Sequence, residues 1–161
     1  MGKSQIVLFV TVVLLGGVTP QRCSFGWVLF QGSCYGFGRE PVSWPDAAAI
    51  CQAFGGYLLE INNQAENDWI VSQVQTRKLG KIWLGSSDMF SEGVFQWTTS
   101  GETIENVANW HPGQPDNTIG VEHCLQMYGE PGNKWNDFWC LEKFRFVCEV
   151  EKAGRRWTYC K

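Results

Sequence analysis

Five oxygen-bearing side chains gather near one pair of cysteines in the last third of this sequence. They are Gln114, Asp116, Glu122, Asn136 and Asp137. Three are carboxylates and two are amides, a mixture of hard oxygen ligands that suits Ca²⁺, which takes about 6–8 oxygens. If all five converge on one divalent cation, the site keeps a net charge of about −1 and has coordination positions left for hydroxyl groups. The pattern predicts a calcium site that binds a hydroxyl-bearing ligand.

The segment 100–123, which holds or adjoins these ligands, is long and rich in Gly, Pro, Asn and Asp, with little hydrophobic periodicity. A stretch of that kind inside a small domain is typical of a functional loop. We therefore expect the ligands to be carried by this loop and by the segments that follow it.

Two helices are predicted before the loop. A capping-box pattern at Ser43, together with a glycine pair after Phe54, predicts a first helix over about residues 44–54. The same pattern at Asn63 and Glu66 opens a second helix. Short apolar and aromatic runs predict strands at 27–30, 34–37, 57–61, 82–85, 95–97, 124–127 and 144–148.

The N-terminus has the composition of an export signal. A charged start, an apolar run over residues 6–15 and small residues after it predict a secretory signal at residues 1–20, cleaved somewhere from 17 to 22. An uncleaved anchor is the alternative, but the run is shorter than the roughly 20 apolar residues of a membrane span. We expect a secreted, extracellular protein without membrane insertion, with one domain at 23–150 and a tail at 151–161.

Cysteine content and charge narrow the class of protein further. All seven cysteines follow the predicted signal, and the net charge is −3. In an exported chain these cysteines indicate a disulfide framework with one left over, and the sequence alone permits many pairings. Basic residues do not cluster apart from Arg155-Arg156, which argues against nucleic acid or an anionic membrane as partner.

Further motifs accompany the ligands along the chain. They are Cys34-Tyr35, Trp44, Ala47, Cys51, Gly56-Tyr57-Leu58, Trp83-Leu84-Gly85, Gln114-Pro115-Asp116, Trp135-Asn136-Asp137 and Cys148-Glu149. In this order they resemble C-type lectin domains, and the stand-alone format resembles perlucin-type secreted lectins of molluscs. The resemblance implies an α+β, disulfide-stapled double-loop fold with two helices and mixed antiparallel sheets. The pairings that it implies for the long form are Cys23 with Cys34, Cys51 with Cys148, and Cys124 with Cys140.

The resemblance also implies a function for residues 23–150 as a carbohydrate-recognition domain. In this family a calcium ion binds the sugar, and the positions that match its ligands are Gln114, Asp116, Glu122, Asn136 and Asp137. A cis peptide bond before Pro115 is implied as well. Mannose-type relatives have Glu and Asn around this proline, whereas the order Gln-Pro-Asp implies galactose-type glycans, GalNAc included, with mannose-type glycans as the second possibility. The order matters because a carboxylate only accepts hydrogen bonds while an amide also donates.

An aromatic side chain often follows the motif in galactose binders of this family, to stack on the sugar. This chain has Thr118 there. Trp110, His111 or Trp139 are the alternatives for an aromatic surface beside the sugar.

A second calcium ion is implied by Asp88 and Glu92, with Glu122 shared between the two sites. Asn117 and His123 stand where carboxylates are common in the family. Fewer charges should weaken this ion.

Other classes of function fit the residues less well. A zinc site made of His111, His123 and cysteines lacks the spacing of zinc motifs, and the cysteines are better used in disulfides. The sequence has no nucleophile motif of a hydrolase, so we expect no enzyme activity. The serious alternative is a structural or interaction protein that keeps the lectin-like fold but binds a mineral matrix or a protein partner.

Cys160, in the C-terminal tail, is the cysteine that the family pairing leaves over. An odd cysteine in a secreted protein indicates an intermolecular bond, so we expect a disulfide-linked homodimer whose two sugar sites gain avidity. Electrophoresis of the secreted protein with and without reductant checks this: a dimer band should collapse in Cys160→Ser. A capped or unpaired thiol would give a monomer band under both conditions.

Overall fold

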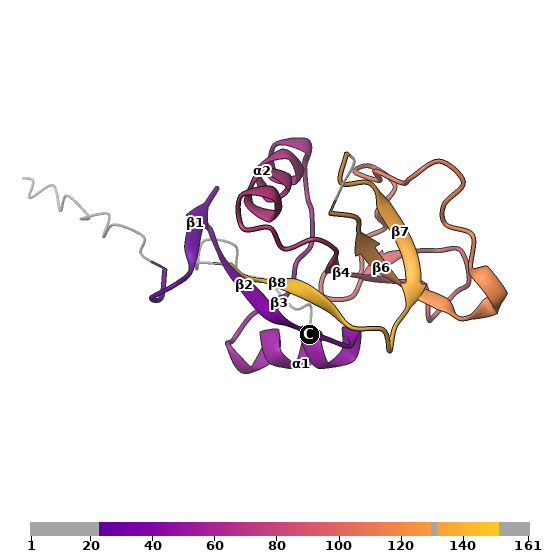
Figure 1. Cartoon of the computed structure of the whole chain (residues 1–161), viewed down its shortest axis with the longest axis horizontal. Helices are drawn as coiled ribbons and strands as arrows, with labels where there is room; N and C mark the ends of the chain where they lie inside the picture. The colour runs from indigo at the N-terminus through magenta and orange to yellow at the C-terminus, as the bar shows by residue number, and fades with distance from the viewer. Residues whose placement is uncertain (1–22, 130–131, 152–161) are drawn as a thin grey trace, which may run out of the picture.

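The computed structural model describes residues 23–129 and 132–151 (Figure 1). The predicted signal, most of the predicted tail and Cys160 lie outside the described residues. The elements in chain order are β1 (Val28–Phe30), β2 (Ser33–Val42), α1 (Trp44–Ala53), β3 (Tyr57–Leu58), α2 (Gln64–Thr76), β4 (Ile82–Ser87), β5 (Gln96–Trp97), the 3-10 turn η1 (Thr118–Gly120), β6 (Glu122–Met127), β7 (Trp135–Trp139) and β8 (Phe144–Glu151).

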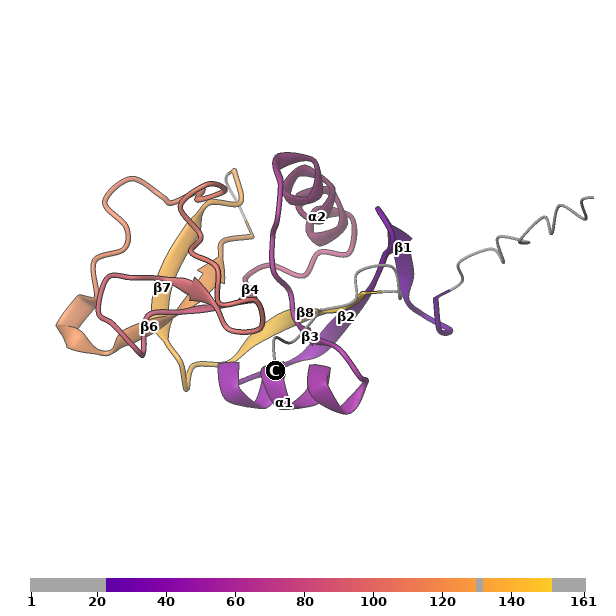
Figure 2. The same ribbon diagram turned by 180° about the vertical axis from the view of Figure 1, so that it is seen from behind.

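The strands form one mixed sheet in the order β1-β2-β8-β4-β6-β7, with β3 paired to β8 and β5 paired to β4. β4 runs parallel to β8, and the other pairings are antiparallel. The two helices lie on opposite sides of the β2–β8 ribbon, and the long loop lies at the other end of the molecule with β6 and β7 (Figures 1 and 2). This is the α+β arrangement of two helices and a mixed sheet that the sequence predicts. No helix within the described ranges is long and apolar enough to cross a membrane.

The helix boundaries follow the capping residues. Ser43 Oγ accepts the backbone N–H of Asp46, and Asn63 Oδ1 accepts the backbone N–H of Glu66, so each helix begins directly after its cap. The expected strand at 57–61 is shorter, because regular pairing with β8 ends at Leu58. The sequence prediction also missed β7 as a strand, since two of its five residues are the polar ligand candidates.

The core is divided into two clusters of buried side chains. The larger lies between α2 and the sheet and includes Ile70, Val74, Leu125 and Trp135. The smaller lies under α1 and includes Trp44, Ala47, Cys51, Leu58, Trp83, Cys124 and Cys148. The disulfides pair Cys23 with Cys34, Cys51 with Cys148 and Cys124 with Cys140, which confirms the pairing implied by the resemblance. The second ties α1 to β8, and the third closes the end of β6 and β7 that carries the ligand candidates.

A buried carboxyl group in β8 makes the stability of this fold depend on pH. Glu149 is 2% exposed, and its Oε1 lies 3.4 Å from the hydroxyl of Tyr35, which donates at 2.6 Å to Glu66 instead. Burial, and after it the negative charge of Glu66, raises the pKa of Glu149 from 4.5 to about 8. The folded protein therefore holds a proton that the unfolded chain releases above about pH 4.5.

The resulting stabilisation is complete below the unfolded pKa and is lost as the pH rises through the folded pKa. We expect Glu149→Gln, which stays neutral, to remove this loss, which amounts to roughly 4 kcal/mol of unfolding free energy between pH 5 and pH 9. Urea unfolding at several pH values measures it, with the exposed Glu142→Gln as control. Parallel pH profiles for wild type and Glu149→Gln would contradict the assignment.

Candidate functional site

The five ligand candidates come from the long loop and from β6 and β7, which follow it. We call these residues the ion site: Gln114, Asp116, Glu122, Asn136 and Asp137. The Gln114–Pro115 peptide bond is cis, as the resemblance implies. Glu122 begins β6, and Asn136 and Asp137 lie within β7. A loop and two paired strands thus bring together residues that are up to 23 positions apart in sequence.

Three carboxylates of the ion site converge. One oxygen each from Asp116, Glu122 and Asp137 lies within 4.8 Å of the others. Asp137 is 1% exposed, Glu122 is half-buried and Asp116 is exposed. Three carboxylates this close repel one another, and a bound divalent cation would offset that repulsion by its attraction to each of them.

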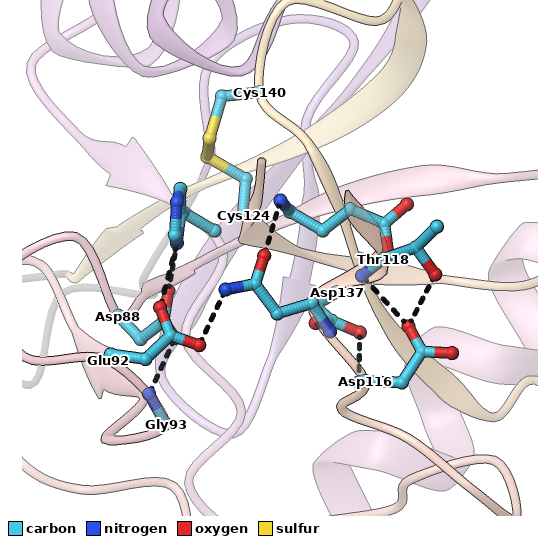
Figure 3. Close-up of polar contacts among 11 residues, drawn as sticks. Asp88, Glu92, Gly93, Asp116, Thr118, Cys124, Asp137 and Cys140 are labelled. Atoms are coloured by element: carbon cyan, nitrogen blue, oxygen red, sulfur yellow. Dashed lines mark hydrogen bonds and ion pairs between the residues drawn. A yellow bond between two sulfur atoms is a disulfide. The ribbon is translucent and has the colours of Figure 1, made fainter. Parts of the chain in front are cut away.

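Backbone amides hold the carboxylates in place (Figure 3). Asp137 accepts the N–H of Asp116 at 3.2 Å and that of Asn117 at 2.7 Å, which fastens the loop after the cis bond to β7. Thr118 donates its hydroxyl to Asp116 at 2.8 Å and its N–H to both Asp116 and Glu122 at 3.2 Å. The sequence prediction did not assign Thr118 a role in positioning the ligands. The one feature of the sequence that could have indicated this role is its place between Asp116 and Glu122.

The two amide ligands provide an independent test of the fit to a cation. Gln114 Oε1 and Asn136 Oδ1 are buried and accept no hydrogen bond from any described residue. The amide nitrogen of Asn136 donates to the backbone oxygen of Asp137, so only its oxygen is left. An unsatisfied buried amide oxygen costs about 1–3 kcal/mol, and coordination to a cation removes that cost. The donor set, three carboxylates and two amide oxygens, therefore fits Ca²⁺.

The titration of the carboxylates reflects the same crowding. Burial, followed by the charges of Asp137 and Asp116, raises the pKa of Glu122 above its ordinary value. Burial also raises the pKa of Asp137. The hydrogen bonds from Thr118 lower the pKa of Asp116. Because a metal binds the ionised form, protons compete for Glu122 and Asp137 more strongly than for ordinary carboxylates.

A second group lies beside the ion site. Asp88 Oδ1 lies 3.1 Å and Glu92 Oε2 lies 3.5 Å from Nδ1 of His123, and the ligand atoms of the three residues lie within 4.8 Å of one another (Figure 3). Gly93 donates its N–H to Asp88 at 2.8 Å. Glu122, expected to be shared, groups with Asp116 and Asp137, while His123 takes the third place here. A second calcium ion at Asp88, Glu92 and Glu122 stays a prediction.

Asn117 connects the two groups. Its Nδ2 donates to Glu92 at 2.6 Å, and its Oδ1 accepts the N–H of Glu122 at 3.0 Å. The positive φ of Asn117, 41°, lets the chain turn there, and asparagine tolerates this conformation better than most residues. The side chain of Asn117 is therefore hydrogen-bonded to a residue of each group.

The structure argues against zinc on the cysteines. The cysteines of the described ranges are paired in disulfides and offer no thiolate. The ring of His111 contacts Tyr128 at 5.8 Å between centroids, while His123 pairs with Asp88. The two histidines therefore have separate surroundings.

Comparison with known proteins gives the same family for sequence and structure. The family model described as the lectin C-type domain matches residues 40–150. The perlucin-like protein of Mytilus galloprovincialis is 32% identical over 92% of this chain and 100% of its own length. The cow C-type carbohydrate-recognition domain of CD23, solved in the presence of a GlcNAc2Man3 oligosaccharide, matches with a TM-score of 0.74 at 29% identity, covering 82% of this chain and 98% of that one. A calcium-independent type II antifreeze protein matches with a TM-score of 0.72 at 27% identity, covering 81% of this chain and 95% of that one. The chain therefore belongs to the C-type lectin-like domain family.

Proposed function

We propose that this protein is a secreted, calcium-dependent lectin that binds galactose-type glycans through the ion site. The observation that carries the proposal is the set of converging carboxylates of Asp116, Glu122 and Asp137. Two buried amide oxygens accompany them, and neither accepts a hydrogen bond from the part of the chain that the structure describes. Such a set has the charge and the oxygen ligands that Ca²⁺ requires. Secretion rests on the predicted signal at residues 1–20.

The residues of the ion site have different roles in binding a sugar. When bound, calcium supplies a fixed positive charge with coordination positions for two neighbouring hydroxyl groups. Asp116, which is exposed, accepts a hydrogen bond from one hydroxyl, and the amide of Gln114 donates to the other. Asp137 stays buried and holds the loop through two N–H groups, so the oxygens that face the sugar keep their positions. This arrangement of acceptor and donor favours the 3,4-diol of galactose.

Affinity chromatography tests the proposal directly. The wild-type protein should be retained on galactose-agarose in calcium and released by EDTA and by soluble galactose. If EDTA releases the protein but soluble galactose does not, the retention is calcium-dependent binding to the column and not recognition of the sugar, which contradicts the proposal. Lack of retention, with calcium binding intact in a titration, would overturn the proposal.

The second candidate is a structural or interaction protein that keeps the fold without sugar binding. The similarity to a calcium-independent antifreeze protein supports it, because that relative shows that this fold serves other surfaces. The exposed Phe90, 92% accessible, and Ile119, 89% accessible, are further surface that a non-sugar partner would cover. A glycan array without any calcium-dependent signal, combined with binding to a mineral or protein surface, would favour this candidate.

A further inference from the structure

The sequence offers three aromatic residues that could lie beside the sugar at the ion site: Trp110, His111 and Trp139. We propose that the indole of Trp139 forms the surface on which the apolar face of the bound sugar stacks. The inference rests on the proposed function and deepens it, because it assigns a specificity-determining residue outside the ion site. It follows from the geometry of β6 and β7, the exposure of Trp139 and the surroundings of the other two aromatic side chains.

Alternation along β7 places Trp139 on the same face as Asp137. Successive side chains of a strand point to opposite faces, so residues two apart share a face. Phe138 and Cys140 occupy the other face: Phe138 packs against Phe144 at 5.3 Å between ring centroids, and Cys140 is bonded to Cys124. Both belong to the surroundings of the core cluster under α1. The opposite face of β7 therefore carries Asp137 and, two residues on, Trp139.

The pairing of β7 with β6 gives a second, independent placement. Glu122 and Trp139 are paired in the antiparallel register, just past a β-bulge in which His123 is the extra residue of β6. Opposite side chains of such a pair lie on the same face, with Cβ atoms about 4.5–5.5 Å apart. Glu122 contributes one of the three converging carboxylates, so Trp139 flanks the ion site from the strand end. η1 (Thr118–Gly120) comes just before Glu122 and lies near this end of β7 (Figure 1).

Trp139 is also available to a ligand, because 47% of its surface is exposed. Most other tryptophans of the described residues are built into the core, including Trp83 and Trp135, which are fully buried. An exposed tryptophan next to a polar site offers an apolar surface with a hydrogen-bond donor at its edge. A sugar ring that binds through its hydroxyl groups on one side presents C–H groups that match such a surface.

Trp110 packs into the core, whereas the exposed ring of His111 lies against Tyr128. Trp110 is half-buried between Phe95, 5.1 Å away, and Trp135, 6.3 Å away, both measured between ring centroids. His111 has its ring against Tyr128, and its Nδ1 lies 3.0 Å from the carbonyl oxygen of Pro112. Trp135 begins β7, so Trp110 packs at the end of the strand away from Trp139. Strand register and exposure thus favour Trp139 over Trp110 and His111 as the aromatic side chain that takes the role expected at Thr118.

Three variants test the role of Trp139. Galactose affinity at saturating calcium should fall roughly ten-fold in Trp139→Ala and stay within about three-fold of wild type in Trp139→Phe, which keeps an aromatic ring. The control is Leu141→Ala, which removes another exposed apolar side chain just past β7 and should leave the affinity unchanged. Calcium affinity, titrated without sugar, should be the same in all three variants, because Trp139 supplies no ligand oxygen.

A spectroscopic readout separates stacking from a structural role. The indole N–H resonance of Trp139, assigned by its disappearance in Trp139→Phe, should shift when galactose is added in calcium and stay unchanged when galactose is added with EDTA. Unchanged galactose affinity in Trp139→Ala, an unperturbed resonance, or a parallel loss of calcium affinity would each overturn the inference. If Trp139→Ala does not fold, the resonance still decides, because Trp139→Phe supplies its assignment. Failure of wild-type protein to bind any sugar would overturn the proposed function and this inference together, whereas wild-type binding with an unchanged variant overturns the inference alone.

Discussion

Replacing Asp137 by alanine is expected to weaken calcium binding at least about a hundred-fold and to abolish retention on galactose-agarose. Asp137 is 1% exposed and is one of three converging carboxylates, so its loss removes a charge that water cannot replace inside the site. The same change leaves the N–H groups of Asp116 and Asn117 without the acceptor that fastens the loop to β7. Calcium titration and column retention measure the two effects.

The fold should survive this change, because the three disulfides and both core clusters lie outside the substituted side chain. Asp68→Ala is the matched control: it removes an exposed carboxylate of α2 whose partner is Gln64, far from the ion site in the chain. It should bind calcium and galactose as wild type does. Retention of Asp137→Ala at the wild-type level would refute the assignment of the ion site.

Exchanging the two side chains around Pro115, by Gln114→Glu together with Asp116→Asn, is expected to reverse sugar preference from galactose to mannose, by roughly ten-fold in each direction. The double change keeps the number of carboxylates in the ion site, so calcium affinity should change little. The double change moves the amide, which can donate a hydrogen bond, from position 114 to position 116, and moves the carboxylate, which only accepts, from 116 to 114. The oxygen that would replace the Asp116 carboxylate can still accept the hydroxyl of Thr118, now at 2.8 Å, so the loop should keep its shape.

The single variants are the controls for this exchange. Gln114→Glu alone adds a carboxylate to the ion site and Asp116→Asn alone removes one, so each should alter calcium affinity, in opposite directions. A glycan array at saturating calcium compares all three variants with wild type. If the profile of the double variant matches that of wild type, the order of donor and acceptor does not set specificity, and the stacking surface at Trp139 becomes the stronger determinant.

Local signals in the sequence determined much of the framework. The caps at Ser43 and Asn63 predicted the starts of α1 and α2, because a capping side chain needs only the next turn of backbone to act. The ion site was predicted as a set of residues from ligand chemistry, which depends on residue type. The order of the motifs gave the fold and the disulfide pairing through the family, and the structure confirms both.

The tertiary structure decided what depends on pairing between distant segments. The polar residues of β7 hid the strand, since its burial comes from β6 and from the packing around Trp135 and not from an alternating pattern of its own. The pairing of β6 with β4 placed His123 beside Asp88 and Glu92. Which aromatic side chain flanks the ion site was decided in the same way. Trp110 and Trp139 are alike in sequence, but strand register buries the first against Trp135 and leaves the second exposed opposite Glu122, because the face a side chain takes is fixed by the strand it pairs with.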